Sequence, residues 1–305
     1  MGDAVPDSGP DRKYRARALV INYAEAWSAA VLLWLCARLP LSVASGIGGA
    51  VARTIGPYTA RSRIAVRNLA RAFPDKSPQE VRAILRAMWD HVGRLALESA
   101  HLRAIDCYAP DSPVEVVGAE HIDAVKASGR GAIFFAGHIG QWDIPPMAVQ
   151  QRGVDATIIY REINNPVLNR VMAYWRAPMG AFKNKGRSAA KTLIEGLREG
   201  RHFAMLVDQK MNDGIAVPFF GRPAMTAPAI AQFAVRDDVP IVPARCERLG
   251  GTRFRVTFYP PLEASRTGDR ARDVATTMER VNALLEGWIR EHPEQWLWVH
   301  RRWPE

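Results

Sequence analysis

A histidine and an aspartate lie five residues apart in the segment GHIGQWD, residues 137–143, directly after an apolar run. An imidazole can take a proton from a hydroxyl group, and a carboxylate that binds its other ring nitrogen holds it in the tautomer that acts as a base. His138 and Asp143 are therefore the candidate catalytic pair. Because residues five apart in one regular helix face different directions, we expect His138 in the turn before a helix and Asp143 in its first turn. The alternative is a structural histidine at a strand end.

No side chain near this pair in the sequence is suited to act as a covalent nucleophile. No serine or cysteine lies near it in the sequence and the G-x-S-x-G pattern is absent, so a covalent acyl-enzyme has no evident attacking group. The pattern predicts a direct transfer, in which His138 takes the proton of a substrate hydroxyl that attacks an activated acyl group. Gly137 and Gly140 permit a tight turn and the close approach of a substrate.

The elements that must position this pair follow from apolar runs that alternate with helical stretches beyond about residue 114. The runs are GAIFFAG, ATIIYR, HFAMLVD, PIVPARCER and FRVTFYPP. This order predicts an α/β core over residues 114–305, one integrated catalytic domain with a mostly parallel central sheet and helices on both faces. Ligands of such sheets bind beyond the carboxyl ends of the strands, which is where His138 falls.

The first 113 residues differ from this core. Residues 1–13 are polar and expected to be disordered, and residues 14–113 are expected to form a helical, membrane-associating region. The uncharged stretch 26–37 is shorter than the roughly 20 residues that a spanning helix needs. With Trp27 and Trp34 as interfacial anchors, it predicts a helix lying in or partly inserted into a membrane. The alternative is a buried helix of a soluble fold.

The charge and cysteine content restrict the partners. A formal charge of +10 favours anionic partners such as nucleic acid, anionic lipid or an acidic carrier protein. Nucleic acid is less favoured, because the sequence has neither a zinc-module spacing nor an RNA-binding aromatic signature. Three widely separated cysteines predict free thiols in a reducing compartment: Cys36, Cys107 and Cys246.

The H-x4-D pattern is the signature of glycerolipid and lysophospholipid acyltransferases, and the chain resembles one branch of them, the bacterial lipid A late acyltransferases. Segments that match this family occur in its order and span nearly the whole chain: NLARAFPDKS, GHIGQWD, YREINNP, LVDQK, VPFFGRPAMTAPA and HPEQWLWVHRRW. The resemblance implies an enzyme at the cytoplasmic face of the bacterial inner membrane. It would move a fatty acyl chain from acyl carrier protein to a hydroxyl of an anionic lipid A precursor, without metal or bound cofactor.

The resemblance and the strand ends together mark further candidate substrate-binding residues: Gly140, Arg161, Asp208, Gln209, Gly221, Arg222 and Thr226. His138, Arg161 and Asp208 are expected to cluster at one edge of the sheet. The segment FFGRPAMT precedes a helix whose free N–H groups could hold an anion. The structural alternatives are a strand-end ion pair for Arg161, a cap for Asp208 and the N-cap of the following helix for Thr226.

Two features leave the acceptor open. The lipid A branch usually has glutamate where this chain has Asp143, whereas aspartate is usual in the wider superfamily. A related branch, which the chain also resembles, acylates phosphatidylinositol mannoside from acyl-CoA. A thioesterase that passes the acyl group to water and a non-catalytic lipid-binding protein are the alternatives from other functional classes.

The other histidines carry no partner pattern. His91 belongs to this group, with His101, His121, His202 and His292, and each is expected to be structural or at the surface. The segment WLWVHRRW is basic and interleaved with tryptophan, which would suit an interfacial surface, but His300 is expected to serve in a C-terminal packing clasp.

Overall fold

The computed structural model describes residues 12–184 and 187–303. The expectation of a disordered N-terminus therefore falls mostly outside the described residues, which begin with the first residue of helix α1 at Arg12. The cysteines are free and buried, as predicted, and burial raises the pKa of both Cys107 and Cys246 to about 12.

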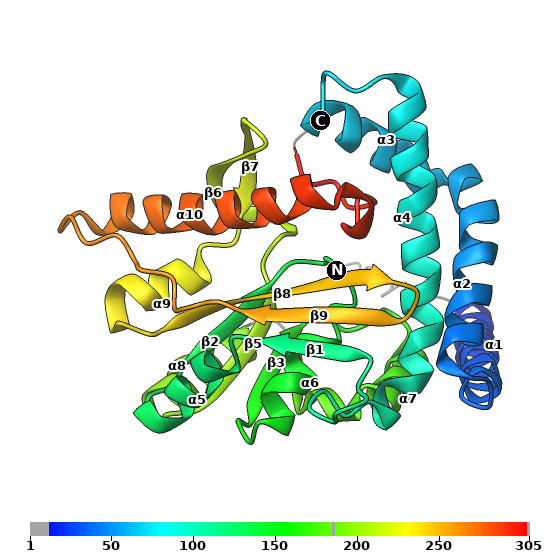
Figure 1. The fold of residues 1–305 in the computed structure, drawn as a ribbon, viewed down its shortest axis with the longest axis horizontal. Coiled ribbons are helices and arrows are strands. Elements are labelled where there is room, and N and C mark those ends of the chain that lie inside the picture. Colours follow the sequence, from blue (N-terminus) through cyan, green and yellow to red (C-terminus); the bar gives the residue numbers. More distant parts are fainter. Residues whose placement is uncertain (1–11, 185–186, 304–305) are drawn as a thin grey trace, which may run out of the picture.

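The described strands form a central sheet and a separate hairpin (Figure 1). Their bounds are β1 Val114–Val117, β2 Ile133–Ala136, β3 Ala156–Tyr160, β4 Phe182–Asn184, β5 His202–Leu206, β6 Lys210–Phe219, β7 Arg222–Thr226, β8 Ile241–Gly250 and β9 Arg253–Phe258. The central sheet has the order β1-β9-β8-β2-β5-β3-β4. Its neighbouring strands are parallel except for the antiparallel pair β8 and β9, so the prediction of a mostly parallel sheet is confirmed.

Helices cover both faces of this sheet. Their bounds are α1 Arg12–Cys36, α2 Leu41–Ile55, α3 Ala60–Ala72, α4 Pro78–Glu98, α5 Ala119–Ser128, α6 Ile144–Gln151, α7 Pro166–Trp175, α8 Arg187–Arg198, α9 Ala229–Asp237 and α10 Arg270–Glu291. Side chains alternate along β2, so Ile133 and Phe135 join the hydrophobic core on the side of α9 and α10, while Phe134 joins the core on the side of α5 and α6. Figure 1 shows α10 on one side of the sheet and α5 and α6 on the other.

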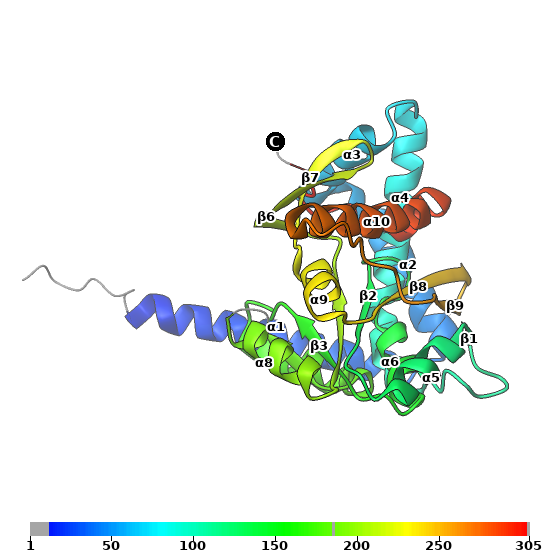
Figure 2. The same ribbon diagram turned by 90° about the vertical axis from the view of Figure 1, so that its left-hand side faces the viewer.

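The N-terminal helix α1 is exposed rather than enclosed by the fold. Trp27 is 67% exposed and Trp34 is 51% exposed, which contradicts the alternative of a buried helix. Residues Leu19–Cys36 are long and apolar enough to cross a membrane, and only 17% of them are buried. Figure 2 shows α1 projecting from the side of the molecule.

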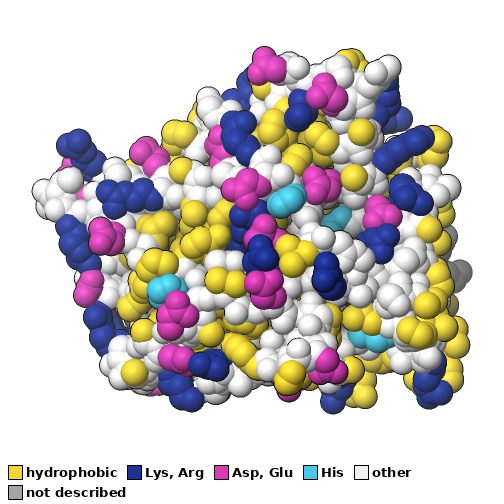
Figure 3. Space-filling model, in the orientation of Figure 1, with side chains coloured by type: hydrophobic (Ala, Val, Ile, Leu, Met, Phe, Trp, Pro, Cys, Tyr) yellow, Lys and Arg dark blue, Asp and Glu magenta, His cyan; other side chains and the backbone are white. Residues whose placement is uncertain are grey.

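Helix α2 packs closely against α4 and leaves an apolar face outside. A Cβ atom added to Gly48 would lie 2.2 Å from the carbonyl oxygen of Gly93, so the two helices touch through backbone. Beside this contact, α2 presents an exposed apolar stripe with a spacing of four residues: Val43, Ile47, Val51 and Ile55. Figure 3 shows hydrophobic side chains along the edge where α1 and α2 lie in Figure 1.

The segment FFGRPAMT forms a hairpin instead of a loop that leads directly into a helix. Strands β6 and β7 are joined by a two-residue turn, Phe220 and Gly221, with φ of +52° and +68°. Positive φ at both central positions is typical of a type I′ turn, in which glycine is favoured. The two short strands β1 and β4 were also not predicted from the sequence.

Candidate active site

The loop after β2 is held in one conformation by the C-terminal segment. The carbonyl of His138 accepts a hydrogen bond from the backbone N–H of Leu297 at 3.1 Å, and the N–H of Gly140 donates to the carbonyl of Gln295 at 3.1 Å. Gly140 has φ of +59°, and a Cβ atom there would lie 2.1 Å from the carbonyl oxygen of Cys246. Gly140 therefore acts through its backbone and does not line the cavity described below.

Asp208 is the carboxylate that contacts His138. Its Oδ1 lies 2.8 Å from His138 Nδ1, and its Oδ2 accepts hydrogen bonds from the backbone N–H of His138 at 2.8 Å and from Trp296 Nε1 at 2.7 Å. Burial alone would raise the pKa of Asp208, which is 3% exposed, but His138 and these donors hold that pKa well below its usual range. An ionised Asp208 accepts the proton of His138 Nδ1, so the lone pair of the ring lies on Nε2.

The expected contact between His138 and Asp143 is not the one formed in the described part of the chain. Asp143 is buried at the start of α6 and its Oδ2 lies 3.1 Å from Arg176 Nε. The reason lies in the sheet, because β2 and β5 are neighbours with Ala136 opposite Leu206. The residues two positions beyond those strand ends, His138 and Asp208, therefore meet.

Gln209 connects His138 to a second imidazole. Its amide nitrogen lies 3.2 Å from His138 Nε2 and 3.0 Å from His300 Nε2. Burial, followed by the charge of His138, lowers the pKa of His300 to about 4. His300 also serves in packing, since its carbonyl accepts a hydrogen bond from Asn68 at 2.6 Å. The expectation of a packing role alone was therefore incomplete; His138, Asp208, Gln209 and His300 are called the cavity cluster below.

A cavity of about 380 Å³ opens at this cluster, within the usual size range of small-molecule sites. Its polar end includes Asp143, Arg161 and Arg176 as well as His138, Gln209 and His300. Its apolar end lies between the sheet and α6, and is lined by Phe134, Val149, Ile158, Met179, Phe182, Ala204, Ala244 and Phe258. The space combines a basic, polar mouth with a hydrophobic interior.

Three of the sequence candidates lie away from this cavity. Gly221 and Arg222 line a separate hollow at the surface. Thr226 is buried and its hydroxyl accepts a hydrogen bond from the guanidinium of Arg302 at 2.7 Å. It is not the N-cap of α9 either, because Pro228 occupies that position. The structure thus brings together the candidates at the ends of β2, β3 and β5, and not those of the hairpin.

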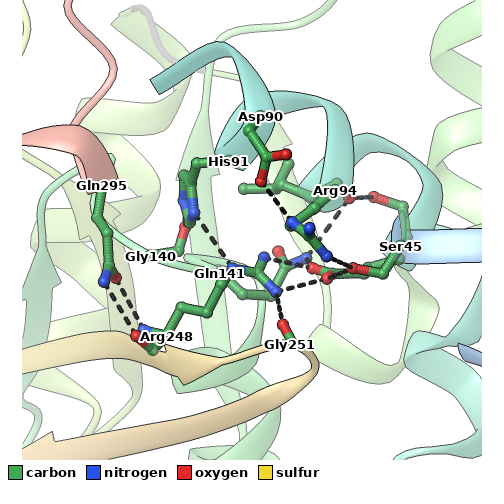
Figure 4. Close-up of polar contacts among 12 residues, drawn as sticks. Ser45, Asp90, His91, Arg94, Gly140, Gln141, Arg248, Gly251 and Gln295 are labelled. Atoms are coloured by element: carbon green, nitrogen blue, oxygen red, sulfur yellow. Dashed lines mark hydrogen bonds and ion pairs between the residues drawn. The ribbon is translucent and has the colours of Figure 1, made fainter. Parts of the chain in front are cut away.

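A buried ionic network supports the loop from the other side. Glu98, 1% exposed, binds the guanidinium of Arg248 at 2.6 and 2.8 Å. The same carboxylate accepts hydrogen bonds from Gln141 in the loop at 3.0 Å and from Ser45 of α2 at 2.7 Å. Together with His91, these residues are called the support cluster (Figure 4).

His91 completes the support cluster. Its Nε2 lies 3.1 Å from the carbonyl oxygen of Gly140, and its Nδ1 lies 3.3 Å from Arg248 Nε (Figure 4). Burial, followed by the charge of Arg248, lowers the pKa of His91 to about 4. A neutral His91 therefore donates to the loop and accepts from Arg248, a role that no sequence pattern indicated.

Within the described ranges, no group of three His, Cys, Asp or Glu side chains is placed to hold a metal ion. The expectation of a reaction without metal or bound cofactor stays a prediction.

A family of known proteins matches this chain along nearly its whole length. The sequence model of a family described as bacterial lipid A biosynthesis acyltransferase matches residues 12–305. A lipid A biosynthesis lauroyltransferase of Escherichia coli K12 is 28% identical over 307 residues, covering 95% of this chain and 94% of the relative. A phosphatidylinositol mannoside acyltransferase of Mycolicibacterium smegmatis is 24% identical, covering 93% and 90%. A lipid A biosynthesis myristoyltransferase of E. coli K12 is 25% identical, covering 78% and 73%.

Proposed function

Because the chain belongs to the bacterial lipid A biosynthesis acyltransferase family, we propose that it transfers a fatty acyl chain from acyl carrier protein to a hydroxyl of a lipid A precursor. The chain is an O-acyltransferase, as the family and its named relatives are. The observation that carries the proposal for this site is the pair of His138 and Asp208 at the mouth of a cavity with an apolar interior.

The proposed reaction is one direct transfer. His138 Nε2 takes the proton of the acceptor hydroxyl while the hydroxyl oxygen forms a bond to the thioester carbonyl carbon. The resulting tetrahedral intermediate loses its carbon–sulfur bond, and His138 returns the proton to the leaving sulfur, so that an ester and a free thiol are formed. Asp208 holds the ring in the required tautomer and stabilises the imidazolium that forms.

The two ends of the cavity fit the two parts of an acyl transfer. The apolar end between the sheet and α6 would receive the acyl chain, since it buries hydrocarbon away from water. Arg161 and Arg176 at the polar end would contact a phosphate of the acceptor or the developing oxyanion. Asp143 orients Arg176 in this scheme, so the aspartate of the H-x4-D pattern contributes through an arginine.

The proposed location is the cytoplasmic face of the bacterial inner membrane. An exposed apolar α1 with two exposed tryptophans and the outer apolar stripe of α2 support association with a bilayer. The formal charge of +10 supports attraction of both an acidic carrier protein and an anionic glycolipid.

One alternative keeps the chemistry and changes both substrates. The similarity to a phosphatidylinositol mannoside acyltransferase covers nearly the whole of both chains, which supports a phosphatidylinositol mannoside as acceptor. In this alternative the donor would be acyl-CoA. Arg161 and Arg176 at the polar end of the cavity would contact a phosphate of either acceptor.

The test is transfer of a labelled acyl group from acyl carrier protein to a tetra-acylated lipid A precursor in detergent. We expect labelled penta-acyl lipid from the wild type and from the control His121→Ala, and about 10³-fold less from His138→Ala. Melting temperatures of the three proteins verify folding. Transfer only from acyl-CoA to phosphatidylinositol mannoside would establish the alternative, release of free fatty acid would indicate a thioesterase, and inactivity with every donor and acceptor would refute acyl transfer.

A further inference from the structure

The amide of Gln209 occupies the place at which the base must meet its substrate. Its nitrogen lies 3.2 Å from His138 Nε2, the atom that takes the acceptor proton in the proposed reaction. The same nitrogen lies 3.0 Å from His300 Nε2, and the two rings are 5.6 Å apart between centroids. Gln209 and both imidazoles line the cavity, so these contacts are made at its surface.

The hydrogen positions follow from counting donors. Asp208 accepts from His138 Nδ1, so His138 Nε2 presents a lone pair when the ring is neutral. His300 is neutral at physiological pH, in keeping with a pKa of about 4, and accepts at Nε2 in the same way. A primary amide has two N–H groups on one nitrogen, and these two acceptors use one each.

The contact with His138 cannot persist during the reaction, because the acceptor hydroxyl needs the same lone pair. When the hydroxyl binds there, one N–H of Gln209 is released into the cavity, beside the base. The second N–H remains bound to His300, which keeps the amide from turning away. A fixed neutral donor beside the attacking hydroxyl is suited to the thioester oxygen, on which negative charge develops as the carbon–oxygen bond forms.

We propose that His300 is a positioning residue for acyl transfer: it anchors the amide of Gln209 so that the freed N–H stabilises the oxyanion of the tetrahedral intermediate. The inference rests on the proposed function. The transfer itself is balanced as described above, since Gln209 and His300 only donate and accept hydrogen bonds and exchange no proton with the substrate.

The test is a double-mutant cycle between His300 and Gln209, measured as kcat and donor KM with the acceptor that supports wild-type transfer. We expect His300→Leu and Gln209→Leu each to lower kcat by about 10²-fold, the usual loss for one oxyanion donor, with donor KM changed by less than about threefold. Because His300 acts through Gln209, the double variant is expected to be no slower than Gln209→Leu alone.

A conservative replacement separates positioning from packing. The carbonyl of a glutamine at position 300 reaches about as far as Nε2 of the histidine, so His300→Gln is expected to recover kcat to within about tenfold of wild type. His300→Asn is polar but too short and is expected to stay slow, and it replaces His300→Leu if that variant fails to fold. His292→Leu, away from the cavity, is the matched control and is expected to keep wild-type kcat.

Losses that multiply in the double variant would overturn the proposal, as would a rise in KM without a fall in kcat. Failure of a folded His300→Gln to recover activity would also overturn it. These outcomes require an active wild type, so they are distinct from refutation of acyl transfer itself, in which the wild type transfers nothing.

Discussion

Each side of the loop that carries His138 contains a histidine beside a charged group, but the sign of that charge differs between the two sides. His91 in the support cluster lies against the cation of Arg248, and both are closed off from the cavity. His138 in the cavity cluster lies against the anion of Asp208, and its second nitrogen faces the cavity. A buried histidine beside a charged group is therefore not by itself a catalytic base. The sign of the nearest charge and access to a cavity decide whether an imidazole can act as a base.

The two clusters also differ in what they can give up. Glu98 and Arg248 form a buried pair whose remaining bonds go to fixed partners, so loss of either member leaves a buried charge without its counterion. In the cavity cluster, the amide of Gln209 can leave His138 without stranding any charge. The support cluster therefore stabilises the loop, whereas the cavity cluster contains a hydrogen bond that can be exchanged for one to a substrate.

The sharpest test of this comparison sets the two candidate acids against each other. Asp208→Asn is expected to lower kcat by about 10³-fold to 10⁴-fold, because the amide no longer holds His138 in the reactive tautomer. Asp143→Asn is expected to cost less than about 10²-fold, because Asp143 contacts Arg176 instead. Steady-state kinetics on folded proteins decide, and a larger loss for Asp143→Asn would return the orienting role to that residue.

Stability rather than rate is expected to change in the support cluster. Glu98→Gln leaves Arg248 buried without a carboxylate and is expected to lower the free energy of unfolding by about 3–5 kcal/mol, measured by urea denaturation. The combined variant Glu98→Gln with Arg248→Met is expected to recover part of this loss. The exposed pair of Glu115 and Arg255 supplies the control, since Glu115→Gln is expected to cost less than about 1 kcal/mol. Equal losses for Glu98→Gln and Glu115→Gln would contradict the description of the cluster as stabilising.

A third test uses pH. Burial and Arg248 lower the pKa of His91 from 6.5 to about 4, against the opposing influence of the hydrogen bond to Gly140 and of Glu98 and Asp90. Between these pH values His91 binds a proton in the unfolded chain but not in the folded chain. The free energy of unfolding therefore falls as the pH drops from about 6.5 to 4, and it levels off below. The expected loss from this group is about 3 kcal/mol. Urea unfolding of wild type and His91→Gln over this range measures it, and identical pH slopes would show that His91 is not held neutral.

The smallest expected effect concerns the apolar end of the cavity. Ala204→Leu adds volume where the acyl chain is proposed to lie, and we expect the ratio of kcat/KM for a shorter over a longer acyl donor to rise about tenfold. Val242→Ile, on the same side of the sheet but not lining the cavity, is the matched control and is expected to leave the ratio unchanged. An unchanged ratio in folded Ala204→Leu would place the acyl chain elsewhere.

The sequence allowed the prediction of each element that shows a strong local pattern. Buried strands appear as apolar runs, so the strand before His138 and the parallel sheet could be predicted. The partner of His138 could not, because spacing favoured Asp143 whereas the contact with Asp208 depends on which strands are neighbours. The support cluster contains contacts between residues as many as 157 positions apart, and no local pattern reports such a pairing.

Helix α2 is both the outermost member of the support cluster, through Ser45, and the bearer of an apolar stripe on its other side. A bilayer seated on that stripe would therefore be joined to the reactive nitrogen by a short chain of rigid contacts. On the proposed location, such an arrangement would set the depth of His138 relative to the lipid headgroups. Among several chemically equivalent hydroxyls on one acceptor, only the hydroxyl at that height would be acylated, and regioselectivity would come from the bilayer as much as from the cavity.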